Sequence, residues 1–478
     1  MEKKNWLTRL NPCGISVCVL AAYFAGSFIF SDFSVSAVLG GALLCLWTGL
    51  TFLQAVFFKG RPRKWEPVDG VLIGFALLVL VNILRHFSLD RTVLYYYLIV
   101  GVVVALLCMT QSVSARCAAI AKWILMGFAL LIAAVNILHL FFPEAMEGAA
   151  AAVLSKTSAA YVERMVKGGY GIPFGEDIGY TCVALAAGVG TVCLDMTGKN
   201  LRSRLPILFV LFLGLLSMQR RSELLVCLVA WGVCSLVKLV KTRKGREEEI
   251  LDRKETRRVI LMQVICIVLA ILIFFLLAGA GSRLGEQLRA WFDPSFRPGD
   301  DPLDPDKPGI HDRVEEVGNG RLILWELAWK GFLEKPIFGH GWGAFAKIAP
   351  ASGNTHAINA HCVFLQLLCE TGIVGFVLMG GIFVALFWLI LRRIKHCPSA
   401  QAFANRGLGL YLFLSMMGLG TIENSLYRPY WILLLGVALL LAFRTKETDD
   451  EKENHADLRD KAGSDQDVPA GEPAEKRA

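Results

Sequence analysis

The chain has 478 residues, of which 55% are hydrophobic and 19% charged, and its mean hydropathy is +0.52. A soluble protein of this length would carry about a quarter charged residues, so this composition excludes an ordinary soluble domain. The formal net charge of +8 is therefore interpreted as membrane topology before nucleic-acid affinity.

Apolar runs recur along the chain, and a run of about 18 residues can cross a hydrocarbon core roughly 30 Å thick. They predict an all-α fold, a polytopic membrane helical bundle of about 12 transmembrane helices with a large extracytoplasmic loop. The predicted spans are about 14–31, 34–58, 68–87, 92–110, 118–142, 176–196, 203–219, 222–241, 259–280, 362–391, 403–421 and 427–443. Residues 1–443 form the membrane domain, and 444–478, with 11 acidic and 7 basic residues, form a disordered tail.

Lysine and arginine alternate between the loops, and this alternation predicts the orientation. The basic loops hold Lys3, Lys4, Arg9, Lys59 to Lys64, Lys199, Arg202, Arg204, Lys241 to Arg258, Arg392, Arg393 and Lys395. The positive-inside rule places these loops and both termini on the cytoplasmic side of the membrane. Residues 143–175 and the long loop at about 281–361 then lie on the extracytoplasmic face.

The long loop has two parts of different character. Residues 293–308 are rich in proline and aspartate, which indicates an irregular exposed segment. Residues 320–334 place Leu322, Trp325, Trp329 and Phe332 at helical spacing. This pattern predicts a helix that either lies along the outer membrane interface or packs on the bundle.

The thirteen cysteines lie mostly in apolar segments and show neither CxxC nor zinc-ligand spacing. We expect no disulfide framework, no metal and no cofactor.

A pair of arginines, Arg220 and Arg221, falls between two predicted spans at the outer end. Two guanidinium groups in so short a turn are costly unless they are paired or bind an anion. One interpretation is pairing with Glu223 or contact with lipid headgroups. The other is an anion clamp, because guanidinium matches the geometry of phosphate.

Further candidate groups lie in the long loop and at outer helix ends. Arg321 is a second guanidinium on the same side, and His361 precedes a span, where its ring could act as acid, base or donor. His356 lies close by in sequence. Glu370 and Glu423 could each be a carboxylate base or an ion-pair partner of the arginines.

These residues resemble the O-antigen ligase and O-antigen polymerase superfamily. The resemblance is carried by Arg321-x3-Trp325, Pro336-x2-Gly-x-Gly-x-Gly343, His361-x3-Leu365-x4-Glu370-x-Gly372 and the helix start at Arg221. Two positions depart from the family pattern: Arg220 stands where serine is usual, and Cys362 where asparagine or serine is common. The second departure removes a side chain that could donate a hydrogen bond at that position.

The resemblance implies a metal-independent glycosyltransferase that takes a glycan from a polyprenyl-diphosphate donor to an acceptor hydroxyl outside the cytoplasm. It implies that Arg221 and Arg321 grip the diphosphate and that His361 lies at the reacting centre. Arg220, Trp325, His356, Glu370 and Glu423 are the remaining candidates for substrate binding. The expected partners are the lipid-linked donor, a glycan or lipid-glycan acceptor, the bilayer and other polysaccharide-assembly proteins, with no nucleic acid.

Two other functions stay open. A transporter or flippase of lipid-linked oligosaccharide would be expected to show ionisable residues at mid-membrane depth and broken helices. A non-enzymatic scaffold would not need two arginines and a histidine on one face. Within the enzyme hypothesis, the sequence does not separate ligase from polymerase or identify the general base.

Overall fold

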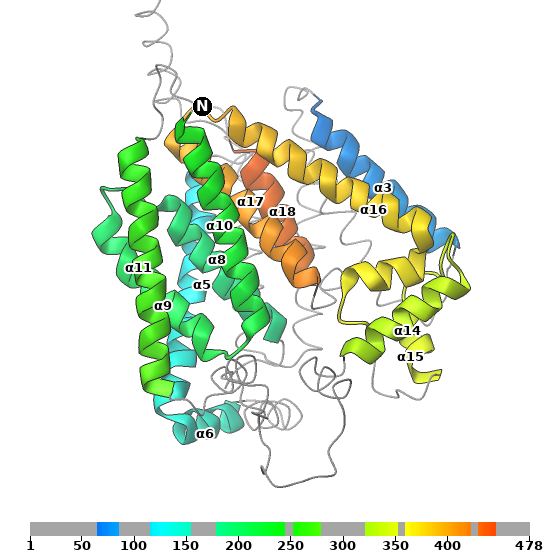
Figure 1. Cartoon of the computed structure of the whole chain (residues 1–478), viewed down its shortest axis with the longest axis horizontal. Helices are drawn as coiled ribbons and strands as arrows, with labels where there is room; N and C mark the ends of the chain where they lie inside the picture. Colours follow the sequence, from blue (N-terminus) through cyan, green and yellow to red (C-terminus); the bar gives the residue numbers. More distant parts are fainter. Residues whose placement is uncertain are drawn as a thin grey trace, which may run out of the picture.

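A computed structural model describes residues 65–85, 115–153, 178–243, 252–278, 321–351, 359–421 and 429–445. These residues are mainly helical and form a bundle with a smaller group of helices at one corner (Figure 1). The helices are α3 (Pro67–Arg85), α5 (Ala115–Phe141), α6 (Pro143–Val153), α8 (Ile178–Asp195), α9 (Leu201–Ser217), α10 (Arg221–Arg243), α11 (Arg253–Ala278), α14 (Arg321–Glu334), α15 (Phe345–Ala351), α16 (Val363–Lys395), α17 (Ala400–Gly420) and α18 (Pro429–Phe443).

The predicted spans agree with these helices to within a few residues wherever the structure describes them. Among the described residues, five helices are long and apolar enough to cross a membrane: α3, α5, α10, α11 and α16. The predicted spans 14–31, 34–58 and 92–110 lie outside the described residues. The all-helical membrane fold is therefore confirmed, while the count of about twelve spans stays a prediction.

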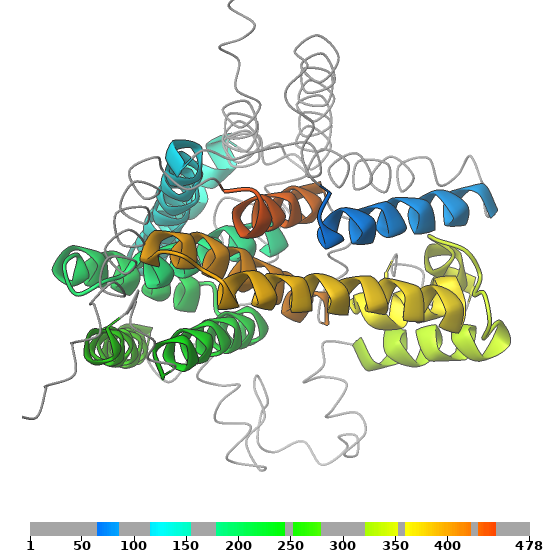
Figure 2. The same ribbon diagram turned by 90° about the horizontal axis from the view of Figure 1, so that it is seen from above.

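The centre of the bundle is α17, which packs against α8, α10, α16 and α18 (Figures 1 and 2). Close helix contact depends on small residues. At Gly190 a Cβ atom would overlap the ring of Tyr411, which is itself fully buried. Without water to drive association inside a membrane, such close van der Waals contact is a main source of helix–helix stability.

Polar contacts join the helix ends that carry the basic residues. Lys122 of α5 lies 2.7 Å from Asp195 of α8, and Lys241 of α10 donates to the carbonyl of Lys395 (2.6 Å) at the end of α16. Nζ of Lys238, also on α10, donates to the carbonyl of Met196 after α8. The ends predicted to be cytoplasmic therefore lie together, at what we call the basic end of the bundle.

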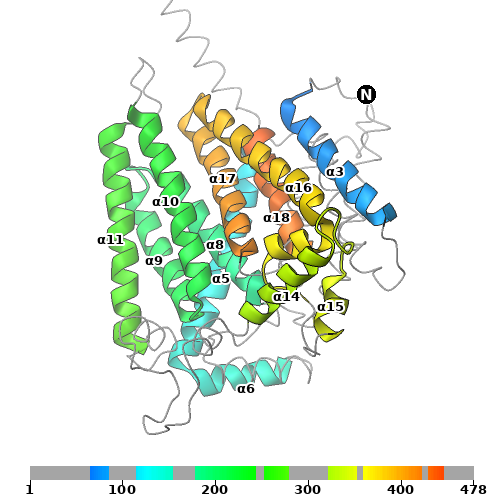
Figure 3. The same cartoon turned by 45° about the vertical axis from the view of Figure 1, so that its right-hand side comes forward.

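The opposite end carries α6, α14 and α15 (Figure 3). The last residue of α3, Arg85, stacks over the ring of Phe338 in the loop after α14, at 4.3 Å from the ring centroid. The end of α3 and the loop after α14 therefore lie together, as expected if both are on the side opposite the basic loops. The assignment of the basic end to the cytoplasm stays a prediction from the positive-inside rule.

We expect a membrane-impermeant thiol reagent to label Pro305→Cys but not His455→Cys in intact cells, in a background without other reactive cysteines. The reason is that residues 281–360 and the tail are predicted to lie on opposite faces. Both positions should react after permeabilisation, which controls for accessibility. Labelling of position 455 but not 305 in intact cells would show that the orientation is inverted.

Candidate active site

The candidate site is built on α14, the loop 335–344, α15 and the beginning of α16. Leu324 and Ala328 of α14, Phe345 and Ala349 of α15, and Cys369 of α16 form a small apolar core of their own. At Gly331 a Cβ atom would meet the sulfur of Cys369 at 2.7 Å, so α14 lies very close to α16. These elements form one packed unit, to which Arg321, Trp325 and Glu370 belong.

The sequence left open whether α14 lies along the outer interface or packs on the bundle, and the structure shows it packed on α15 and α16. Leu324, Ala328 and Gly331 are buried, whereas Trp329 is 45% exposed and its ring lies 5.2 Å from that of Phe332. The helix thus packs on α15 and α16 through small residues and leaves an aromatic pair outside. The sequence pattern was dominated by the large side chains and gave no weight to the alanine and glycine.

A break in α16 was not predicted, because hydropathy does not detect a single backbone angle. Gly372 has φ 65° and ψ −171°, a conformation essentially restricted to glycine, so α16 consists of two helices joined at this residue. A Cβ atom on Gly372 would overlap the backbone of Ile337, and one on Gly339 would overlap the backbone of Glu370. The two glycines therefore allow the loop to enter the break.

Four backbone hydrogen bonds close the break. The N–H groups of His340 and Gly341 donate to the carbonyls of Cys369 (3.2 Å) and Glu370 (2.7 Å). In the other direction, Ile373 and Val374 donate to the carbonyls of Pro336 (2.8 Å) and Ile337 (3.2 Å). A helix end leaves backbone groups unsatisfied, and these bonds satisfy them from the loop.

Glu370 is completely buried and holds the loop from inside. Its Oε1 accepts hydrogen bonds from the backbone N–H of Phe345 (3.2 Å), the first residue of α15, and from Nε2 of Gln366 (3.0 Å). Oε1 of Gln366 in turn accepts from the N–H of Ala360 (3.0 Å). A buried polar chain thus runs from α15 through α16 to the residue next to His361.

His361 has a positive φ of 48°, uncommon for a residue with a side chain, although histidine is among those that tolerate it. Its N–H donates to Oδ1 of Asn359 (3.0 Å), and its side chain is partly exposed. The following residue, Cys362, is the N-cap of α16, and its side chain makes no capping bond. The segment before α16 is bonded to this helix through Gln366, which accepts from the N–H of Ala360.

Arg321 is the first residue of α14 and is partly exposed, and Trp325 follows one turn later on the same face. The indole nitrogen of Trp325 is buried and has no hydrogen-bond partner among the described residues. Buried donors are nearly always paired, so this nitrogen is a candidate donor to a bound ligand.

The turn between α9 and α10 carries the arginine pair. Gln219 has φ 55°, and the chain then re-enters a helix at Arg221. Nη1 of Arg220 lies 2.7 Å from Oε1 of Glu223, and Ser222 donates to Oε2 of the same carboxylate (2.7 Å). Arg220 therefore adopts the ion pair with Glu223 that the sequence left open as one of two interpretations.

The structure brings only some of the predicted residues together. Arg321, Trp325, His361 and Glu370 lie in the unit made by α14, α15 and α16, and the turn with Arg220 lies at the same end of the bundle (Figures 1 and 3). The beginning of α14 is its end nearer to α10 in both views. Arg221 begins α10, while His356 and Glu423 lie outside the described residues.

Sequence reasoning missed Gln366 and the break at Gly372. A signal for the first was present: Gln366 and Glu370 are four residues apart in an apolar helix and so share a face. Within the described part of the chain, no cluster of three or more His, Cys, Asp or Glu side chains is arranged to hold a metal ion.

The fold and the apolar helices define the class: this is a multi-pass α-helical membrane protein with a helical unit held at one end of its bundle. Residues 206–380 match the family model for O-antigen ligase, which confirms the resemblance to the O-antigen ligase and polymerase superfamily over that segment. The matched segment runs from α9 through the break in α16 and includes both arginine-bearing segments and His361. No curated protein is significantly similar to the chain.

We expect Gly372→Ala to destabilise the protein by about 2–3 kcal/mol or more, because it combines a disfavoured backbone angle with overlap at Ile337. Gly380→Ala is the matched control. It lies on the same helix with open space around the new Cβ, and alanine is about 1 kcal/mol better than glycine in a helix. Melting of the purified protein in detergent would measure both. Equal melting temperatures would contradict the described break.

Proposed function

We propose that the protein is a membrane glycosyltransferase that moves a glycan from a polyprenyl-diphosphate donor to an acceptor hydroxyl on the extracytoplasmic face. The family match supports O-antigen ligase-like activity in general terms. The observation that carries the proposal is that the matched segment contains Arg221, Arg321 and His361, and that their elements lie at one end of the bundle, opposite the basic end.

The reaction requires a site of this kind. The acceptor oxygen forms a bond to the anomeric carbon while the bond from that carbon to the diphosphate oxygen breaks. The diphosphate leaves with the bonding electrons and gains negative charge, and the acceptor hydroxyl loses its proton to a base. Fixed guanidinium groups stabilise charge that develops in the transition state and stay protonated throughout.

Arg321 and Arg221 are assigned to the diphosphate. Each is the first residue of a helix at this end, so each is close to N–H groups that are not used within the helix. Helix N-termini and guanidinium groups both favour bound anions. Arg220 is assigned a supporting role, because its ion pair with Glu223 fixes the turn from which Arg221 begins α10.

Trp325 is assigned to the donor or its sugar, because its buried indole N–H has no partner among the described residues. Glu370 is assigned a positioning role, because its Oε1 is committed to Phe345 and Gln366. His356 and Glu423 keep their predicted places in substrate binding. His361 is assigned to the reacting centre, where its positive φ is consistent with a side chain held in a functional orientation.

A transporter or flippase is the second candidate, and the break in α16 is the observation that favours it, since broken helices are typical of transporters. In transporters the unwound backbone usually coordinates the transported ion or substrate. Here four of the backbone groups at the break are bonded to the loop 336–341. The break therefore supports a fixed loop better than an ion site.

We expect Arg321→Ala and Arg221→Ala each to lower glycan transfer by about 100-fold or more, the effect of removing one group that stabilises transition-state charge. Arg321→Lys keeps the charge but loses the fork geometry, and should lose much of the activity. Lys330→Ala, on the same helix and 63% exposed at its side chain, is the matched control and should be near wild type. The measurement is transfer from a purified lipid-linked donor. Full transfer by Arg321→Ala would remove Arg321 from the site.

His361 can be a neutral base or a charged donor to the leaving diphosphate, and pH separates these roles. As a base it must be unprotonated, so transfer should fall as the medium is acidified. As a cationic donor it should lose activity as the pH is raised. His361→Asn is the sharpest variant, because asparagine tolerates a positive φ and keeps a donor but cannot accept the proton near neutrality.

We expect His361→Asn to lower transfer by about 100-fold or more, as for loss of a general base. Protein abundance and melting temperature should match the wild type, because the backbone angle is preserved. Near-normal transfer by this variant would exclude His361 as the base. Glu370, Glu423 and Glu223 would then be the next carboxylates to test.

A further inference from the structure

A second site lies at the basic end of the bundle, far along α16 from the candidate active site. A cavity of about 260 Å³ opens between the beginning of α3 and the ends of α16 and α18, close to the beginning of α17. Its polar lining consists of Arg392, Arg393, His396, Arg406 and the carboxylate of Glu66. Its remaining lining is apolar and includes Leu389 and Phe443.

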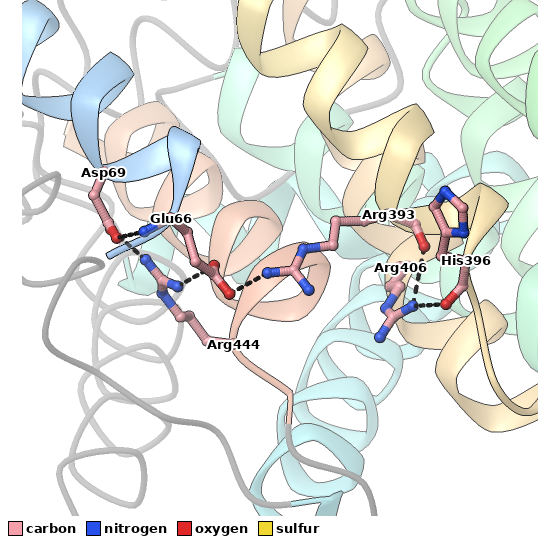
Figure 4. A network of polar contacts seen from close by, with 6 residues as sticks. All are labelled: Glu66, Asp69, Arg393, His396, Arg406 and Arg444. Atoms are coloured by element: carbon pink, nitrogen blue, oxygen red, sulfur yellow. Dashed lines mark hydrogen bonds and ion pairs between the residues drawn. The ribbon is translucent and has the colours of Figure 1, made fainter. Parts of the chain in front are cut away.

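The carboxylates around this cavity are already paired. Glu66 is bonded by both Arg393 and Arg444 (2.7 Å for Arg444), and Asp69 behind it is bonded by Arg444 (Figure 4). Asp69 and Arg444 are almost completely buried. These two carboxylates therefore balance Arg393 and Arg444 and leave the other arginines of the cavity uncompensated.

Arg392 and Arg406 supply the excess positive charge. Nη1 of Arg406 donates to the carbonyls of Arg393 (3.0 Å) and His396 (3.1 Å), so it closes the end of α16 (Figure 4). Arg392 stacks over the ring of Trp388, 5.5 Å from its centroid. Among the described residues neither guanidinium has a carboxylate partner. A cavity lined by two guanidinium groups without carboxylate partners favours the binding of an anion.

Exposed tryptophans mark the level of this cavity relative to the bilayer. Trp65, immediately before α3, is 73% exposed, and Trp388 and Trp123 are 57% and 62% exposed. Trp123 follows Lys122 at the same end of the bundle and carries Arg204 stacked on its ring. Tryptophan gathers where the hydrocarbon meets the headgroups, so the cavity lies at headgroup depth.

We propose that this cavity binds the phosphate of an anionic phospholipid, with the arginines on the phosphate and Leu389 and Phe443 against the start of the acyl chains. Basic pockets between transmembrane helices are suited to such headgroups. The apolar lining and the tryptophans favour a lipid over a free phosphate, which would gain nothing from either. The site is separate from the proposed transfer reaction and does not depend on it.

The test uses the full chain in detergent and measures binding of phosphatidylglycerol by native mass spectrometry. Zwitterionic phosphatidylcholine is the comparison lipid, and glycerol phosphate is the soluble competitor. Arg392→Gln is the test variant, because the described contact of this side chain is the stacking on Trp388. Arg258→Gln is the matched control, an exposed arginine on α11 that does not line the cavity.

We expect phosphatidylglycerol to bind more tightly than phosphatidylcholine, and Arg392→Gln to weaken its binding about fivefold, the effect of one basic residue near a lipid phosphate. Arg392→Lys, which keeps the charge, should lose less, and Arg258→Gln should bind as the wild type does. Melting temperatures in phosphatidylcholine should be equal for all variants.

Equal affinity for phosphatidylglycerol in the wild type and Arg392→Gln would overturn the proposal. This equal affinity is also the result expected if the acidic segment that follows Thr445, and not a lipid, occupies the cavity. Displacement of the lipid by glycerol phosphate at comparable concentration would also overturn it, because the site would then recognise a free phosphate.

Discussion

The candidate site depends on the backbone pairing between the loop 336–341 and the break in α16. Four hydrogen bonds join the loop to the break, and two glycines, Gly339 and Gly372, let the two segments approach closely. The pairing sets where the loop leaves α14 and where α15 begins, and Glu370, next to the break, binds the first N–H of α15 from inside. A polar group buried without a partner costs about 1–3 kcal/mol. Cys369 and Glu370 are completely buried, and their carbonyls are bonded across the pairing. The rigidity of the site therefore originates in the backbone, and the side chains proposed for chemistry are attached to it.

Much of the fold could be predicted from the sequence, because hydropathy and charge act over whole helices. Wherever the structure describes a predicted span, the observed helix agrees to within a few residues, and the basic helix ends lie together as the alternation of lysine and arginine required. The break at Gly372 could not be predicted in this way, since one residue with a positive φ leaves the apolar pattern of α16 intact. The buried face of α14 was also missed, because close packing through Ala328 and Gly331 is invisible to a scale that rewards large side chains.

The candidate site was predicted in part, and the difference is again physical. Arg321, Trp325 and His361 were identified from residue type and position, and the structure places their elements in or against one packed unit. Roles are harder to assign than positions, because a carboxylate or guanidinium has the same sequence signature whether it binds substrate or protein. Arg220 proves to be bonded to Glu223, and Glu370 to Gln366 and Phe345. Only the bonding partners seen in the structure distinguish a positioning residue from a binding one.

The two ends of α16 face opposite sides of the bundle, and the helix connects them directly. After Gly372 the helix runs without interruption to Lys395, a length of ~35 Å at the usual rise per residue. At one end its backbone is bonded to the loop of the candidate active site, and at the other Arg393 is bonded to Glu66 beside the arginine cavity. Both regions present guanidinium groups to the surroundings, but their settings differ. At the basic end Glu66 and Asp69 are bonded to arginines, and exposed tryptophans lie on the helices nearby. At the site end Arg221 and Arg321 are the first residues of helices, beside N–H groups that are not bonded within the helix. We propose that the same residue type binds a lipid phosphate in one setting and a diphosphate in the other, because the environment determines which phosphate reaches it.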